Sequence, residues 1–114
     1  MLEQMRTESV LTNFELMVLL ALIRLGDDAY GVPISREIEE RSGREVPIAS
    51  IYSALERLAG KGFVTSELGD PTPERGGRAK RYFEVTALGL REVRDVKATL
   101  VKMWRGLVLE GGKP

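Results

Sequence analysis

The stretch PERGGRAKRYFEV, residues 73–85, combines a glycine pair with an unusual concentration of positive charge. Between positions 75 and 83 there is no acidic residue but four cations: Arg75, Arg78, Lys80 and Arg81. Glycines let a backbone turn and approach a surface closely, and clustered cations bind phosphate oxygens and release counterions from a nucleic acid. Taken alone, such a stretch is more typical of a solvated hairpin loop. Its interpretation therefore depends on the elements that precede it.

The composition argues against catalysis. The chain of 114 residues has no Cys and no His, which excludes disulfides, thiolate zinc sites and cysteine nucleophiles and removes the commonest general base and metal ligand. Asp70, Glu74 and Glu84 lie near the basic stretch, but nothing indicates a buried carboxylate pair or a nucleophile. We therefore expect no enzymatic activity, no metal site and no cofactor.

A second group of candidate functional residues lies on a predicted helix that begins near Pro47 and is followed by Gly62. Its apolar residues repeat at helical spacing and predict a buried face: Ile48, Ile51, Leu55 and Leu58. The opposite face is small, polar and cationic: Ala49, Ser50, Ser53, Arg57 and Lys61. Short or hydrogen-bonding side chains such as Ser50, Ser53 and Arg57 allow a helix to enter the DNA major groove. Arg57 and Lys61 are equally compatible with ordinary solvated positions.

Two further helices are predicted upstream. The sequence TNFE at 12–15 is typical of a capping box and predicts a helix that begins at Thr12 and ends near Gly26. This helix is apolar nearly all round, so it requires burial inside the domain or against a second subunit. The sequence YGVPISREIEERSG, residues 30–43, places Pro33 in a first turn and Gly43 at the end of a short amphipathic helix.

Two alternating segments, 63–68 and 80–85, predict a two-stranded hairpin with a long tip. Two short helices followed by a hairpin with a basic tip have the layout of a winged helix-turn-helix. In that layout Arg78, Lys80 and Arg81 would meet phosphates or the adjacent minor groove. The predicted fold class is therefore α+β, mostly α, with a winged helix-turn-helix and a long C-terminal dimerisation helix.

The C-terminal helix is predicted to begin with Thr86 as its N-cap and to end near Leu109. Apolar residues at alternating spacings of three and four predict a seam against another helix: Val93, Val96, Leu100, Met103 and Leu107. Val101, Trp104 and Val108 lie beside this seam. A small domain cannot cover so long a stripe, and helix-turn-helix proteins generally read two half-sites as dimers. We therefore predict a homodimer with Trp104 in the interface.

The remaining composition is that of one globular domain, with 43% hydrophobic and 30% charged residues and a formal net charge of zero. The longest apolar run, 16–23, is too short to span a membrane and no signal peptide is evident, which predicts a cytoplasmic protein without a membrane partner. We expect four parts: an N-terminal arm or helical extension (1–11), a winged helix-turn-helix domain (12–85), a dimerisation helix (86–109) and a tail (110–114).

Several motifs occur together in one order: Ala29-Tyr30-Gly31, SIYSALERLAGKGFV at 50–64 and GGRAKRYFEVTALG at 76–89. Over roughly residues 12–107 the chain resembles the PadR family of transcriptional regulators, and its single terminal helix resembles the short subgroup. The resemblance implies a dimeric winged-helix repressor that binds double-stranded operator DNA. By position it implies DNA contacts at the start of the recognition helix and in the wing: Ser50, Tyr52, Ser53, Arg78, Lys80 and Arg81.

The resemblance has limits in the recognition helix. The family often has Gly-Thr-Leu-Tyr-Pro where this chain has Ala-Ser-Ile-Tyr-Ser at 49–53, so no operator sequence can be carried over. Tyr52 has two interpretations, a DNA contact or an aromatic that packs between helices with its hydroxyl at the rim. Tyr30 and Tyr82 are interpreted as scaffold residues at the helix pair and the base of the wing.

Some short members of the family bind flat aromatic molecules and then release DNA. The resemblance therefore implies that Trp104, with Met103 beside it, forms a stacking platform for a planar ligand, although an interface-core role for Trp104 remains the simpler interpretation. We expect a sequence-specific DNA-binding repressor released by a small planar hydrophobic effector. The alternative is a winged-helix protein-interaction module without specific DNA binding, which retention on DNA resin at low salt would distinguish.

Overall fold

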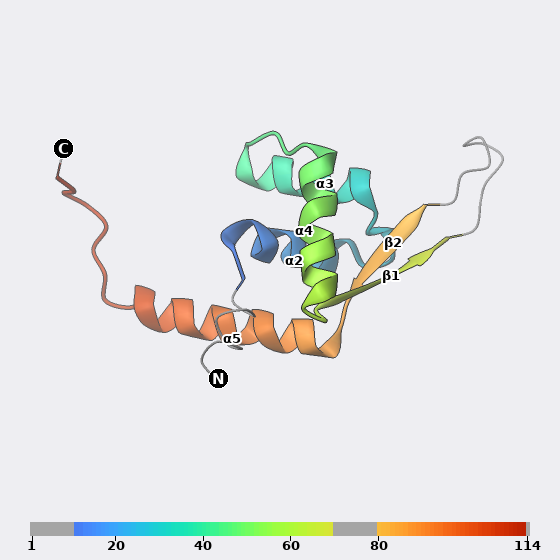
Figure 1. Cartoon of the computed structure of the whole chain (residues 1–114). Coiled ribbons are helices and arrows are strands. Elements are labelled where there is room, and N and C mark those ends of the chain that lie inside the picture. Colours follow the sequence, from blue (N-terminus) through green and yellow to red (C-terminus); the bar gives the residue numbers. More distant parts are fainter. Residues whose placement is uncertain (1–10, 70–79, 114) are drawn as a thin grey trace.

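The structure is a computed structural model that describes residues 11–69 and 80–113 (Figure 1). It is mostly helical with one small antiparallel sheet, which confirms the predicted fold class. The elements, in chain order, are α2 (Asn13–Leu25), a 3-10 turn (Gly26–Asp28), α3 (Gly31–Ser42), α4 (Ile48–Gly60), β1 (Val64–Leu68), β2 (Arg81–Val85) and α5 (Ala87–Trp104).

Local sequence signals set the ends of the first two helices as predicted. Thr12 and Glu15 form a capping box: the Glu15 amide donates to Thr12 Oγ1 at 3.0 Å, and the Thr12 amide donates to Glu15 Oε1 at 2.9 Å. Gly43 ends α3 in the left-handed conformation, with φ of 74°, a backbone state that glycine adopts without steric cost.

The core lies where α2, α3 and α4 meet the base of the hairpin. Its buried apolar side chains come from every one of these elements: Val18, Leu19, Ala21, Leu22, Ala29, Ile34, Ile38, Ile51, Ala54, Leu55, Leu58, Phe63, Val64 and Phe83. The prediction that Ile48 belongs to the buried face of α4 is wrong, because Ile48 is 38% exposed. The contact face instead follows the spacing of residues 51, 54, 55 and 58, one continuous stripe of an α-helix.

The hairpin is attached to the helices at its base. In its antiparallel register Val64 lies opposite Val85 and Leu68 lies opposite Arg81. The Phe83 amide donates to the Ala29 carbonyl oxygen at 2.8 Å, which ties β2 to the chain segment that enters α3. The tip of the hairpin, residues 70–79, lies outside the described residues, and Arg75 and Arg78 lie there with it.

A second attachment joins α5 to the turn between α4 and β1. Thr86, the predicted N-cap, accepts a hydrogen bond from the Gly89 amide at 3.0 Å and donates its hydroxyl to the Gly62 carbonyl oxygen at 2.7 Å. Gly89 lies so close to this turn that a Cβ atom on it would be 2.3 Å from the Phe63 carbonyl oxygen. We call this contact the Thr86–Gly89 junction.

The predicted end of the last helix is wrong. The helix ends at Trp104 rather than near Leu109, because Arg105 is extended, with φ of −61° and ψ of 130°, and Gly106 has a φ of 81°. A glycine in the left-handed conformation is a common helix stop, and Gly106 is the signal in the sequence that marks it. Leu107 therefore lies beyond the helix to whose seam it was assigned.

Candidate nucleic-acid interface and apolar groove

The outer face of α4 is small and polar, as predicted. Ser50 and Ser53 are both exposed, on the first half of the helix. Among the described residues no side chain caps the start of this helix at Pro47. Amides at an uncapped helix start lie at the positive end of the helix dipole, where anions such as phosphate are favoured.

Tyr52 combines a structural contact with exposure. Its ring meets the buried Phe83 ring edge to face, with centroids 6.2 Å apart. A Cβ atom on Gly31 would lie 2.7 Å from the Tyr52 hydroxyl oxygen, so only glycine leaves room for this tyrosine at the start of α3. The packing interpretation of Tyr52 thus has direct contacts in the structure, whereas contact with DNA stays a prediction.

Arg57 and Lys61, on the last turn of α4 and just after it, both turn toward α2. Arg57 Nε donates to Glu15 Oε2 and Lys61 Nζ donates to Glu15 Oε1, each at 2.8 Å. Glu15 is only 1% exposed. Burial by itself raises the pKa of a carboxyl group, but the hydrogen bonds from Lys61, the Thr12 amide and Arg57 outweigh it and lower the pKa of Glu15 from 4.5 to about 2.

The tip-side end of the two strands holds two of the predicted cationic residues, Lys80 and Arg81. Lys80 Nζ lies over the Tyr30 ring, 3.8 Å from its centroid, and the Tyr30 ring in turn meets the Tyr82 ring edge to face at 5.4 Å. This arrangement agrees with the scaffold interpretation of the two tyrosines. Arg81 is exposed and donates from Nη1 to Ser66 Oγ across the strands at 3.1 Å. The contact with the Tyr30 ring orients the Lys80 side chain.

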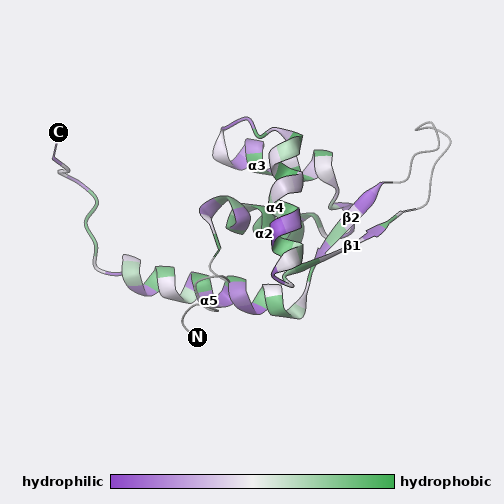
Figure 2. Ribbon diagram, viewed as in Figure 1, coloured by the Kyte–Doolittle hydropathy of each residue, from purple (hydrophilic) through white to green (hydrophobic). Residues whose placement is uncertain are grey.

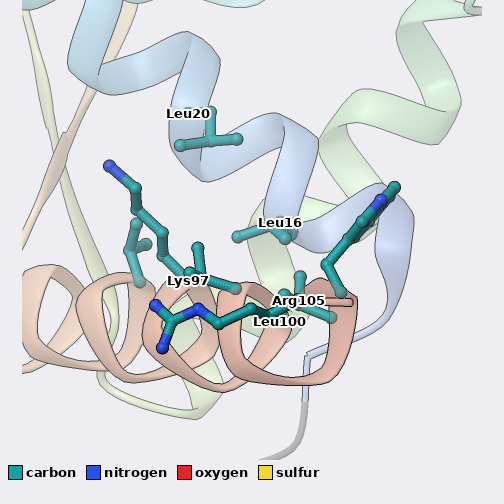
Figure 3. Close-up of a pocket in the computed structure, with 8 residues that line it drawn as sticks. Leu16, Leu20, Lys97, Leu100 and Arg105 are labelled. Atoms are coloured by element: carbon teal, nitrogen blue, oxygen red, sulfur yellow. The ribbon is translucent and has the colours of Figure 1, made fainter. Parts of the chain in front are cut away.

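A groove of about 480 Å³ lies between α2 and α5, and we call it the apolar groove (Figure 3). Figure 3 shows Leu16 and Leu20 on α2 directed toward Leu100 and Lys97 on α5. Its lining is mainly apolar, with two cations and no acidic side chain among the eight described residues: Leu16, Leu20, Val93, Lys97, Leu100, Val101, Trp104 and Arg105. Trp104 is 61% exposed although it is the largest apolar side chain of the groove.

The residues of the predicted seam take different positions. Val93 and Leu100 line the apolar groove, and Val96 is half-buried. Met103 is 70% exposed and lies outside the groove lining. Apolar residues continue exposed past the helix end, at Leu107, Val108 and Leu109. Figure 2 shows apolar segments along the part of α5 that projects beyond the helical core.

The described residues offer little support for other kinds of site. Among the described residues, 11–69 and 80–113, no group of acidic side chains is placed to hold a metal ion. No helix in the described part of the chain is long and apolar enough to cross a membrane.

The helices α2, α3 and α4 pack together and are followed by a two-stranded hairpin, and the outer face of α4 is polar. This arrangement defines a winged helix-turn-helix protein. The model of the transcriptional regulator PadR-like family matches residues 19–95. The chain therefore belongs to the PadR-like family of transcriptional regulators, as its motifs indicate. Among curated proteins, none matches the chain significantly.

Solved structures agree with this assignment. The structure of a hsRosR complex designated RosR-S1 is 32% identical, with a TM-score of 0.63, over 81% of this chain and 75% of that one. A PadR family regulator from Eggerthella lenta is 26% identical, with a TM-score of 0.65, over 92% of this chain and 82% of that one. PadR of Bacillus subtilis, solved in complex with operator DNA, shares the fold at 21% identity and a TM-score of 0.64, over 90% of this chain and 55% of that one.

Two residues that matter to this geometry were not among the predicted site residues. Glu15 was recognised only as a capping residue, because nothing local in the sequence indicates cations that lie 42 and 46 residues further along the chain. Gly89 lies three residues after Thr86, a spacing that indicates a helix start. The sequence does not indicate that Gly89 packs against the turn at Phe63.

Proposed function

We propose that the chain is a homodimeric repressor that binds operator DNA through α4 and the hairpin and releases it when a planar aromatic ligand occupies the apolar groove. The observation that carries this proposal is the presence of two separate exposed surfaces on one small domain: a polar and cationic one on α4 and the hairpin, and an apolar one on α2 and α5. Membership of a regulator family does not favour the alternative of a protein-interaction module.

The division of labour on DNA follows from side-chain chemistry. Ser50 and Ser53 are short, exposed hydrogen-bonding groups on one face of α4, which suits them to contact base edges in a major groove. Lys80 and Arg81 are cations at the tip-side end of the strands, which suits them to phosphate contacts with DNA of any sequence. Arg78 in the tip and Tyr52 join this set as proposed contacts, whereas the pairing of Arg57 with Glu15 gives Arg57 a structural role.

The exposed apolar surface supports the dimer. Leu20, Leu100, Val101 and Trp104 form part of a surface that a soluble monomer rarely leaves open to water. A second copy packed against α5 would cover this surface through Val93, Val96 and Leu100, with Met103, Trp104 and Leu107 at its edge.

The lining of the apolar groove specifies the ligand further. Trp104 offers an exposed indole face for stacking, and Lys97 and Arg105 bring positive charge without any acidic lining residue. A planar aromatic molecule with a negative charge satisfies both features. Such a ligand shifts the protein only if it binds the DNA-incompetent arrangement more tightly than the competent one.

The test combines DNA binding with two ligands of opposite charge. Labelled DNA from immediately upstream of the gene is titrated by fluorescence anisotropy against a scrambled competitor, with 2-naphthoate or 2-naphthylmethylammonium added. We expect preferential binding to the upstream DNA and its release by 2-naphthoate at concentrations about three to ten times lower than by the cationic analogue, because solvent-exposed cations give modest selectivity.

A matched pair of variants locates the ligand. Trp104→Ala should abolish release by 2-naphthoate, whereas Met103→Ala, at an exposed position outside the groove lining, should respond like the native chain. Equal responses from both variants would remove Trp104 from the mechanism. Absence of any preference for upstream over scrambled DNA would point to a different operator, and absence of all DNA binding would contradict the proposed function.

A further inference from the structure

Glu15 is a buried carboxylate whose hydrogen bonds connect two helices. It accepts hydrogen bonds from the Thr12 amide at 2.9 Å, from Arg57 Nε at 2.8 Å and from Lys61 Nζ at 2.8 Å. Thr12 and Glu15 belong to the start of α2, whereas Arg57 and Lys61 lie at the end of α4. One carboxylate therefore connects the start of α2 to the end of α4.

Glu15 is buried, whereas the side chains of its partners Arg57 and Lys61 remain 50% and 20% exposed. Removing a carboxylate from water costs several kcal/mol, which its partners offset only when their geometry is good, and apolar side chains of similar volume often stabilise as well or better. Apolar contacts already hold α2 to α4, through residues such as Leu19 and Leu55. Those contacts are not directional, whereas hydrogen bonds to both carboxylate oxygens fix an angle and a register.

Because the ion pair lies at the end of α4, a small change in the angle between α2 and α4 moves the start of α4. Arg57 is anchored on the last turn, and Ser50 lies seven residues earlier, roughly 10 Å along the helix axis. A tilt of about 10° at the anchored end would displace the start of the helix by roughly 2 Å. Hydrogen bonds between side chains and bases tolerate displacements of only a few tenths of an ångström.

We infer that Glu15 is a positioning residue: by holding Arg57 and Lys61 it sets the orientation of α4, and so determines which DNA sequence the chain prefers without touching DNA itself. This inference rests on the proposed DNA-binding function. Leu16, the residue after Glu15, lines the apolar groove, so one short segment of α2 borders the groove and contacts α4.

The substitution Glu15→Gln tests the inference, because it removes the charge and keeps the size of the side chain. Its matched control is Glu37→Gln, which removes the carboxylate of another ion pair, with Arg41, that lies entirely within α3. Dissociation constants for upstream and scrambled DNA are measured for the native chain and both variants. The ratio of the two constants is the readout, because a smaller folded fraction would weaken both affinities equally and leave their ratio unchanged.

We expect Glu15→Gln to reduce this ratio by about five- to thirtyfold while the affinity for scrambled DNA stays within about twofold, and Glu37→Gln to keep the native ratio. A folded Glu15→Gln protein with the native ratio would overturn the inference and leave the proposed function intact. If circular dichroism shows that Glu15→Gln does not fold, Lys61→Gln removes one of the two cationic partners, and a native ratio in that variant would overturn the inference. A native chain without sequence preference would overturn the proposed function and this inference together.

Discussion

The surface formed by α4 and the hairpin and the surface formed by α2 and α5 differ in how completely one chain builds them. On the first, side chains find partners within the chain: Lys80 lies on Tyr30, Arg81 bonds Ser66, and Tyr52 meets Phe83. On the second, large apolar side chains such as Leu100 and Trp104 remain exposed. Several described side chains of the polar surface thus have partners within the chain, whereas large apolar side chains of the second surface remain open to water.

This difference explains why the zero net charge of the chain is a poor guide to its function. Charge acts through its local distribution over roughly 10 Å, because salt screens exposed charges at longer distances. The described cations Lys80 and Arg81 concentrate positive charge at the tip-side end of the strands, whereas the second surface is mainly apolar. The following predictions test whether the two surfaces are as separate as this comparison implies.

The largest effect is expected at the Thr86–Gly89 junction, where the two surfaces are joined. Gly89→Ala would place a Cβ atom 2.3 Å from the Phe63 carbonyl oxygen and 2.8 Å from the Val85 side chain, so the start of α5 or the turn must move. We expect the free energy of unfolding to fall by about 4 kcal/mol, measured by urea denaturation. The control Gly60→Ala has open space around it and should stabilise α4 by about 0.5 to 1 kcal/mol. Equal stabilities of the two variants would contradict the close contact.

The next largest effect is acid destabilisation at Glu15. Because its pKa is lowered in the folded chain from 4.5 to about 2, its contribution to stability is fully present above pH 4.5 and is lost as the pH falls toward 2. Arg57 and Lys61, which face it, stay charged over this range. We expect a loss of up to about 3 kcal/mol that is absent from Glu15→Gln. Urea midpoints of both proteins between pH 6 and 2 measure it, and parallel curves would show that the pKa of Glu15 is the same in the folded and the unfolded chain.

A smaller effect should separate the apolar groove from the remainder of α5. Leu100→Glu puts a charge on the groove lining and should weaken dimerisation about a hundredfold, or roughly 2.7 kcal/mol, because taking a carboxylate out of water costs more than the exposed cations Lys97 and Arg105 offset. Met103→Glu changes a position outside the lining and should weaken it less than about fivefold. Sedimentation velocity over a concentration series gives both dissociation constants. A larger effect from Met103 would favour the seam predicted from the sequence over the groove.

The smallest effect concerns the polar surface alone. Lys80→Met removes the cation over Tyr30 and should cost about 0.5 to 1 kcal/mol of stability. It should also weaken binding to every DNA sequence and reduce the slope of log affinity against log salt by about 1. The control Lys102→Met, on α5, should leave the slope unchanged. Anisotropy titrations at four salt concentrations measure this, and equal slopes in all three proteins would exclude Lys80 from phosphate contact.

The features that sequence predicted well are those governed by neighbouring residues. The capping box of Thr12 and Glu15 and the stop at Gly43 involve residues within one turn of each other, so their types decide the outcome. The alternating hairpin segments and the polar face of α4 likewise follow from short-range periodicity. Family motifs then identified the assembly of these elements.

The features that sequence did not predict depend on distant partners. Arg57 has the pattern of a solvated or DNA-facing cation, and only the packing of α2 on α4 brings it to Glu15. Ile48 has the spacing of the buried face, but it is the first residue of α4 and is 38% exposed. The end of α5 was different, because Gly106 gave a local signal that the apolar periodicity through Leu107 outweighed.

The Thr86–Gly89 junction gives α5 the mechanics of a lever. The helix is about 27 Å long and is fixed at one end to the turn that closes α4. A displacement of about 5 Å at its far end, beside Trp104, corresponds to a rotation of only about 10° at the fixed end. A rigid helix of this length therefore converts a movement of several ångströms beside Trp104 into a rotation of a few degrees at the junction.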